Sequence, residues 1–141
     1  MAEQLHIVTL GSDDIVRAAA FWEAMGWQRR MQAADGIAFF QSGGMALALY
    51  PFDKLAEDCG MVDRGPGFGG FTLAILQPSP EAVDALMARA IANGASLQKP
   101  ATPAFWGGYS GYVLDPDGHP WEIAHNPFVA LHADGGVDFP A

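Results

Sequence analysis

The sequence has a single cysteine, Cys59, and few charged residues of either sign. One cysteine excludes an internal disulfide and a zinc site built from several thiolates. We expect Cys59 to be an ordinary thiol, because nothing near it marks an activated one. Only 7 residues are basic against 16 acidic ones, which gives a formal net charge of −9 with no basic cluster. That charge would repel nucleic acid and an anionic bilayer, so we expect neither as a partner.

Long hydrophobic runs are also absent. No apolar stretch approaches the roughly 18 residues of a membrane span, and the first residues lack the positive charge of a signal peptide, so we expect a cytoplasmic protein. Hydrophobic residues nonetheless make up 50% of the 141 residues and charged residues only 16%. This balance is typical of a folded domain. With so few charged residues a monomer would expose apolar surface, and we therefore expect a homodimer that covers it.

The first half of the chain predicts one strand, one helix and three further strands. Residues 5–10 form a β-rich run, and Ser12 or Asp13 can cap a helix that follows to about Met25. Apolar residues recur along this helix at intervals of three and four, and Gly26 can end it with a positive φ angle. The further strands are expected at residues 27–31, 36–41 and 45–50.

The second half repeats this order. Ser79 can cap a helix that begins at Pro80 and stops at Asn93-Gly94. The expected strands are residues 71–76, 95–98, 111–114 and 119–124, and the expected buried stripe of the helix is Val83, Leu86, Met87, Ala90 and Ile91. The last hairpin has the residue order of a type I turn at residues 115–118. A duplicated βαβββ unit fits if the second copy gained about six residues within positions 99–108.

Between the two copies, residues 51–70 contain several glycines and indicate a flexible joint. We therefore expect one domain over residues 1–141. Its first module covers about 4–51, the joint about 52–69, the second module about 70–127, and a tail of residues 128–141 lies over the surface or a partner.

Two segments carry a family resemblance. Residues 10–27 (LGSDDIVRAAAFWEAMGW) and residues 115–122 (DPDGHPWE), in this order and spacing, resemble the vicinal oxygen chelate superfamily of glyoxalases, bleomycin resistance proteins and extradiol dioxygenases. The resemblance covers residues 5–127. It implies an α+β fold in which tandem βαβββ modules form a curved mixed sheet, with helices on the convex face and the ligand on the concave face.

Enzymes that this chain resembles usually hold a divalent metal on the concave face. The ligands are His or Glu from the first strand of each module and a Glu from a last strand. Glu122 matches the last-strand position, and the resemblance therefore makes it the candidate ligand or catalytic base. Its counterpart in the first module is Ala48, which offers no carboxylate.

The first-strand positions are no richer in metal ligands. One falls on Ile7, with His6 on the opposite face unless a one-residue bulge exchanges them. The other falls on Phe71 or Thr72. An open catalytic site needs about three protein ligands, so we expect no tight metal site and no certain cofactor. The alternative is a divalent metal bound weakly by His6 and Glu122.

Aromatic residues supply the candidate binding surface. Phe105, Trp106 and Tyr109 lie among glycines where the second copy is longer than the first, which favours a pocket wall or lid for a flat ligand. The alternative is a loop held by its own aromatics or used at a dimer contact. Tyr50 and Phe71 are further candidates for the pocket, although Tyr50 fits a core position nearly as well.

Glu122 itself admits two interpretations. It can bind the polar end of a ligand or act as a base with a raised pKa, or it can be a residue without function that a backbone or tyrosine donor holds in place. His6 fits a packed or rim position as well as a ligand, His119 fits the surface, and His125 has no predicted role.

The leading hypothesis is therefore a glyoxalase- or bleomycin-resistance-like protein that binds an unidentified apolar or aromatic small molecule without a tight metal. One alternative is a metal-dependent lyase, isomerase or dioxygenase that uses Glu122. The other is a non-catalytic interaction module.

Overall fold

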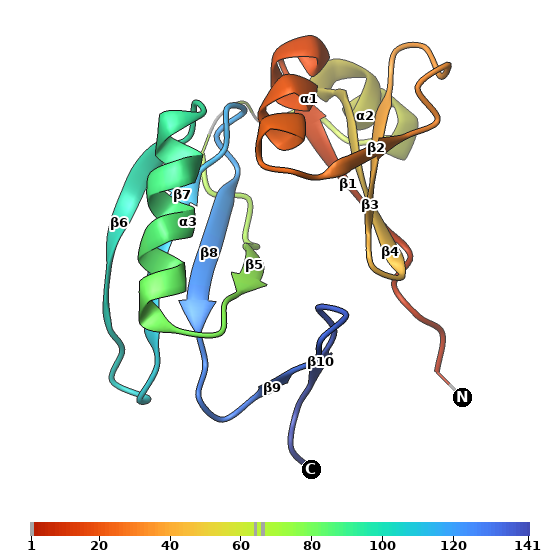
Figure 1. The fold of residues 1–141 in the computed structure, drawn as a ribbon. Helices are drawn as coiled ribbons and strands as arrows, with labels where there is room; N and C mark the ends of the chain where they lie inside the picture. Colours follow the sequence, from red (N-terminus) through yellow and green to blue (C-terminus); the bar gives the residue numbers. More distant parts are fainter. Residues whose placement is uncertain (1, 64, 66) are drawn as a thin grey trace. The chain divides into compact units, whose positions relative to one another are not determined.

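A computed structural model describes residues 2–63, 65 and 67–141 (Figure 1). The chain divides into two compact units, Met1–Gly67 and Phe68–Ala141. Each unit contains a four-stranded sheet, with the strand order β1-β4-β3-β2 in the first and β5-β8-β7-β6 in the second. The two orders are the same when the strands are numbered within their own unit, which confirms the predicted duplication. In the described part of the chain, no helix has the length and apolar character needed to cross a membrane.

The first unit begins with the predicted strand and helix. In its sheet, β1 is parallel to β4 and the remaining pairs are antiparallel. The elements are β1 (Ile7–Ser12), α1 (Ile15–Ala24), β2 (Gln28–Arg30), β3 (Ala38–Ser42), β4 (Met45–Pro51) and α2 (Phe52–Cys59). Residues that α1 buries include Ala18, Ala19, Phe21 and Trp22.

The cap of α1 differs from the prediction. Asp14 is the capping residue, and its side chain accepts a hydrogen bond from the Arg17 N–H at 3.1 Å. Strand β1 continues through Ser12, whose buried hydroxyl accepts from the Asp14 N–H at 3.1 Å. The chain therefore leaves the strand later than expected, and the helix starts later too. Gly26 follows the helix with a φ of 90°, as predicted.

Helix α2 contradicts the prediction that the joint starts at residue 52. Its apolar residues Phe52, Leu55, Ala56 and Cys59 recur at helical spacing, and Gly60 ends it with a φ of 72°. The Phe52 ring occupies the space that a side chain on Gly11 would need, so α2 is held against β1. Cys59 is exposed at the end of this helix.

The second unit follows the same plan and adds a tail. Its elements are β5 (Leu73–Leu76), α3 (Pro80–Ala92), β6 (Ser96–Pro103), β7 (Tyr109–Leu114), β8 (Pro120–His125), β9 (Ala130–Leu131) and β10 (Val137–Asp138). Figure 1 shows α3 lying across one face of the β5–β8–β7–β6 sheet. The last two strands pair as a small antiparallel hairpin in the tail, where no strand was expected.

Helix α3 begins and ends where the sequence predicts. The Ser79 side chain accepts from the Ala82 N–H at 3.1 Å, and Asn93 is the last cap. The buried stripe is narrower than predicted, because Val83, Met87 and Ala90 are buried whereas Ile91 is 43% exposed.

The additional residues of the second module lengthen a strand. We expected them in a loop, but β6 runs to Pro103, with register shifts between Leu97 and Lys99 and between Lys99 and Thr102. Such bulges absorb extra residues on an edge strand while the pairing with its neighbour continues. The loop that remains is short, and the Ala104 N–H closes it by donating to the Gly108 carbonyl at 2.8 Å. The following turn is as predicted, with the Gly118 N–H donating to the Asp115 carbonyl at 2.9 Å.

Candidate functional site

Glu122 lies on the face of the second sheet that points away from α3. Side chains alternate along a strand, and its neighbour Ile123 pairs with Gly111, beside which the Met87 side chain of α3 lies. In the sheet, Glu122 pairs with Ala74 of β5 and with Tyr112 of β7. The three side chains therefore share one face, which we call the Glu122 face.

A hydrogen bond joins two of these residues. The Tyr112 hydroxyl donates to Oε2 of Glu122 at 3.2 Å. Burial raises the pKa of Tyr112, the negative charge of Glu122 and the hydrogen bond to it raise this pKa further, and a hydrogen bond with Thr72 opposes them. Thr72, Tyr112 and Glu122 thus form one polar cluster. A tyrosine donor for Glu122 was one of the two interpretations that the sequence allowed.

Each unit has one residue at the first-strand position that the resemblance gives to a metal ligand. The register of β1 identifies it in the first unit, and the interaction with Tyr112 identifies it in the second. Strand β1 pairs with β4 without a bulge, and Thr9 lies opposite Ala48, so Ile7 shares the face of Ala48 as predicted. His6 precedes the strand and is exposed. In the second unit Thr72 is the residue that interacts with Tyr112. Phe71 is 49% exposed, and its ring lies near Gly69.

The predicted aromatic cluster does not lie on the Glu122 face. The Tyr109 hydroxyl donates to Oδ1 of Asp84 on α3 at 2.7 Å, so this side chain lies on the helix side of the sheet. Interaction with Asp84 raises the pKa of Tyr109. Trp106 lies over Gly108 and fills the space that a side chain there would need. The loop is therefore anchored by its own aromatic residue, which was the alternative interpretation.

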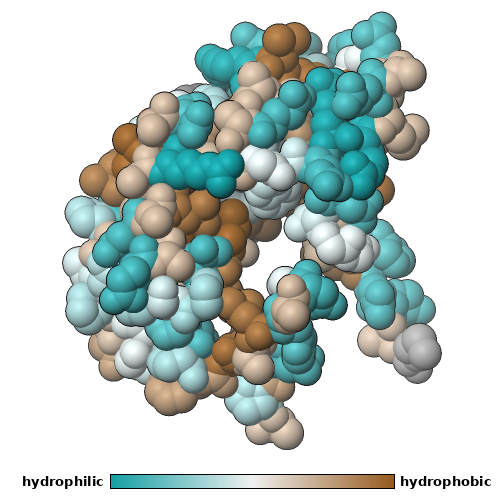
Figure 2. Space-filling model, in the orientation of Figure 1, coloured by the Kyte–Doolittle hydropathy of each residue, from teal (hydrophilic) through white to brown (hydrophobic). Residues whose placement is uncertain are grey.

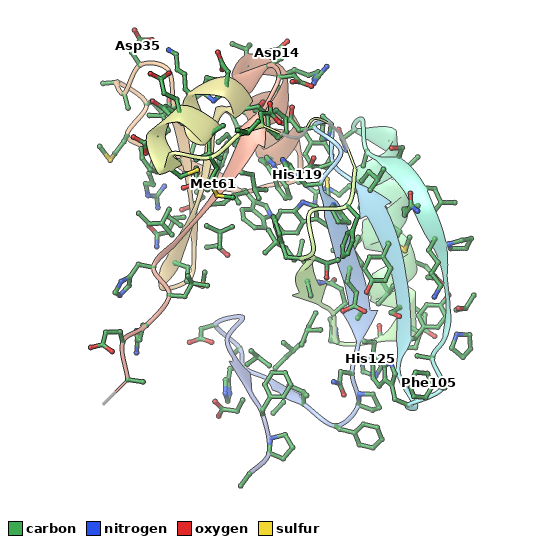
Figure 3. The ribbon with its side chains drawn as sticks, turned by 180° about the vertical axis from the view of Figure 1, so that it is seen from behind. Asp14, Asp35, Met61, Phe105, His119 and His125 are labelled. Carbon is green, nitrogen blue, oxygen red and sulfur yellow. The ribbon has the colours of Figure 1, made fainter. Side chains whose placement is uncertain are left out.

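The other aromatic candidates are Phe105 in the second unit and Tyr50 in the first. Phe105 is fully exposed, and Figure 3 shows it at the tip of the loop between β6 and β7. Tyr50 alternates with Leu49 on β4 and shares the face of Ala48, as predicted, where it is half-buried. Figure 2 shows apolar side chains gathered near β5 of the second unit.

The donor atoms do not fit a tight divalent metal. Within the described residues, no group of three or more His, Cys, Asp or Glu side chains could hold a metal ion. Ile7 and Ala48 have no donor atom, and Thr72 offers a neutral hydroxyl. Glu122 is the one carboxylate among these four positions, and Tyr112 already occupies one of its oxygens. Divalent ions in proteins are normally held by several such ligands.

Sequence reasoning missed Tyr112. The signal was available, because the turn at residues 115–118 fixes the register of the β7–β8 hairpin. Leu114 pairs with Pro120, and counting two residues back on β7 and two forward on β8 brings Tyr112 opposite Glu122.

Comparisons with known proteins agree with this arrangement. Residues 4–123 match the family model for the glyoxalase/bleomycin resistance protein/dioxygenase superfamily. A glyoxalase-related enzyme from Fulvimarina pelagi is 39% identical, with a TM-score of 0.89, over 99% of this chain and 100% of that one. A family enzyme from Burkholderia phytofirmans PsJN is 25% identical, with a TM-score of 0.76, over 87% of this chain and 98% of that one. No match was found among curated proteins.

Proposed function

Because the chain belongs to the glyoxalase/bleomycin resistance protein/dioxygenase superfamily, we propose that it binds a small molecule on the Glu122 face. The observation that carries this proposal is the bond between Tyr112 and Glu122. A carboxylate on a partly apolar sheet face is costly unless it is hydrogen-bonded. One tyrosine donor leaves three of its four lone-pair positions for a ligand.

The chemistry of this face defines the class of ligand. Glu122 accepts hydrogen bonds, so it suits a hydroxyl, an amine or an amide N–H. Tyr112 both donates and accepts, and Thr72 lies beside it. Ala74 on β5 lies opposite Glu122 and is exposed, which leaves room and apolar contact on this face. We therefore propose a largely apolar or aromatic ligand with one polar end that donates a hydrogen bond.

A tightly bound metal is not part of this proposal. Four positions match the superfamily's usual ligands, and in this chain they are Ile7, Ala48, Thr72 and Glu122. A single carboxylate would bind Mg²⁺ or Mn²⁺ only together with water and ligand oxygens.

The test combines a binding screen with metal analysis. Protein purified without chelator is screened by native mass spectrometry against aromatic alcohols and amines, and its metal content is measured. We expect binders whose affinity falls at least about tenfold, or about 1.4 kcal/mol, in Glu122→Gln, with the melting temperature nearly unchanged. Glu57→Gln, an exposed residue of α2, is the matched control. Stoichiometric metal, or equal affinity in Glu122→Gln, would contradict the proposal.

A second candidate is an enzyme, which the similarity to the glyoxalase-related enzyme from Fulvimarina pelagi favours. In that case Glu122 would be the general base, and the hydrogen bond from the Tyr112 hydroxyl would hold its side chain in place. Turnover of a ligand found in the screen would then be lost in Glu122→Gln while binding of the product persists. Turnover retained in that variant would exclude this role for Glu122.

A further inference from the structure

A cavity of about 240 Å³ lies at one end of the second unit. It is formed where β5 leads into α3, where β8 ends and where the tail begins, so all of its walls belong to one unit. The lining residues are Gln77, Pro78, His125, Asn126, Pro127, Val129 and Leu131. Its size suits a compound of a few to about ten non-hydrogen atoms.

This cavity is separate from the Glu122 face. His125 is the last residue of β8 and pairs with Tyr109, whose hydroxyl donates to Asp84 of α3. Its side chain therefore lies on the α3 side of the sheet, whereas Glu122 lies on the other side. Figure 3 shows His125 at the end of β8, where the chain leaves the sheet for the tail.

The imidazole of His125 is held in one tautomer. Its Nδ1 lies 3.1 Å from the carbonyl oxygen of Gln77. A carbonyl can only accept, so the bond requires the proton to be on Nδ1. The neutral ring then has its lone pair on Nε2. The Gln77 carbonyl keeps the ring in place, and in its neutral form the ring offers Nε2 as an acceptor in the wall of the cavity.

Two amide side chains complete the polar wall. Oδ1 of Asn126 accepts from the Phe128 N–H at 3.0 Å, which leaves the NH₂ group of Asn126 as donor. Nε2 of Gln77 donates to the Leu76 carbonyl at 2.9 Å, which leaves Oε1 of Gln77 as acceptor. The cavity therefore combines donors and acceptors within a few residues.

The remaining walls are apolar and stiff. Pro78 and Pro127 have fixed φ angles, and Val129 and Leu131 add aliphatic surface from the tail. None of the seven lining residues is Asp, Glu, Lys or Arg. Since no permanent charge is present to pair with an ionised ligand, a neutral ligand is favoured.

From this geometry we propose that the His125 cavity is a binding site for a small, neutral, planar compound that carries a hydrogen-bond donor next to an acceptor, as in an amide or lactam. The ligand N–H donates to Nε2 of His125, and the ligand carbonyl accepts from the NH₂ group of Asn126. The apolar part packs against the two prolines and Leu131. This proposal is independent of the function proposed for the Glu122 face.

The experiment uses the full chain with benzamide and δ-valerolactam as probes. Backbone amide resonances are followed by NMR during titration, with toluene and benzoate as matched compounds that lack the amide. We expect at least one of the two amide compounds to reach saturation, with the largest resonance shifts at Gln77, Val129 and Leu131. Its affinity should be at least tenfold higher than that of toluene or benzoate. The proposal would be overturned if neither compound reached saturation below about 10 mM.

Variants separate the cavity from the other site. His125→Phe removes the acceptor and keeps a ring, and Leu131→Trp fills the cavity without changing His125. Both should weaken amide binding at least tenfold while the rest of the NMR spectrum stays folded. Glu122→Gln should leave the shifts that the amides cause at Gln77, Val129 and Leu131 unchanged, since these residues line the His125 cavity or its rim. Unchanged shifts at Gln77 and Val129 in the folded Leu131→Trp protein, or loss of these shifts in Glu122→Gln, would refute the assignment to this cavity.

Discussion

The indole nitrogen of Trp121 donates to Oδ2 of Asp115 at 3.0 Å, and both residues are buried. The other carboxylate oxygen of Asp115 accepts from the backbone N–H groups of Asp117 and His119, each at 3.0 Å. One side chain therefore ties the turn to the strand that carries Glu122. Burial raises the pKa of the Asp115 carboxyl, while the charge of His119 and these hydrogen bonds act in the opposite direction.

Asp115→Ala should lower the free energy of unfolding by about 2 kcal/mol, because three donors lose their acceptor and the Trp121 N–H stays buried. Chemical denaturation followed by tryptophan fluorescence measures this change. Asp35→Ala, an exposed loop residue of the first unit, is the matched control and should be nearly neutral. A loss below about 0.5 kcal/mol in Asp115→Ala would show that the turn does not depend on this carboxylate.

The hydrogen bond between Tyr112 and Glu122 can be tested by titrating the Tyr112 hydroxyl at alkaline pH. The pKa of Tyr112 is raised above 10.0 by burial and by Glu122. Between 10.0 and the raised value the folded chain binds more protons than the unfolded one, so stability contributed by this group falls as the pH rises through that window. Glu122→Gln removes the charge, which should move the tyrosinate absorbance step of Tyr112 to lower pH and reduce the alkaline loss of stability.

Tyr109 provides the internal control for that titration. Its pKa is raised chiefly by Asp84, so Glu122→Gln should leave its step in place, whereas Asp84→Asn should move it. Tyr112→Phe identifies which step belongs to which residue. If Glu122→Gln leaves the Tyr112 step unchanged, the two side chains do not interact in solution.

At Gly111 the second sheet lies close against a side chain of α3. A Cβ at this position would lie 2.6 Å from Sδ of Met87 and 2.8 Å from the backbone nitrogen of Ala101. Gly111→Ala should therefore destabilise the protein by about 1 to 3 kcal/mol through overpacking. Gly44→Ala is the control, because nothing lies within 4 Å of its Cβ position. Equal melting temperatures for the two variants would contradict this packing.

Much of the fold could be predicted because it depends on local signals. Gly26 and Gly94 each follow a helix with positive φ, and Ser79 caps α3 with its own side chain. Helix α2 was missed although Phe52, Leu55 and Ala56 have helical spacing, because its other residues are mostly charged and its neighbours are rich in glycine. The extra residues of β6 were assigned to a loop, since bulges depend on pairing with β7 that no local pattern reveals.

The site was less predictable, because it depends on which face a side chain takes. Glu122 could be identified from its place in the last strand, but Tyr109 was grouped with it and Tyr112 was not. These two tyrosines are three positions apart on one strand, so they point to opposite faces, and only the register with β8 decides which one meets Glu122. The homodimer and the cytoplasmic location stay predictions.

The contact between α2 and β1 depends on the absence of a side chain at Gly11. The Phe52 ring fills the space beside Gly11, and α2 is short and has no buried residue. Short helices draw their stability from such packing. Gly11→Ala should therefore displace the ring and destabilise the first unit by about 1 to 3 kcal/mol.

A double-mutant cycle tests this relationship directly. Phe52→Ala alone should cost stability through lost packing, and in that background Gly11→Ala should cost at least about 1 kcal/mol less than in the native chain, because the clash is gone. The free energies come from chemical denaturation, and hydrogen exchange of the α2 amides reports the helix itself. Additive losses in the double variant, with α2 exchange unchanged in Gly11→Ala, would mean that Phe52 does not anchor α2 through Gly11.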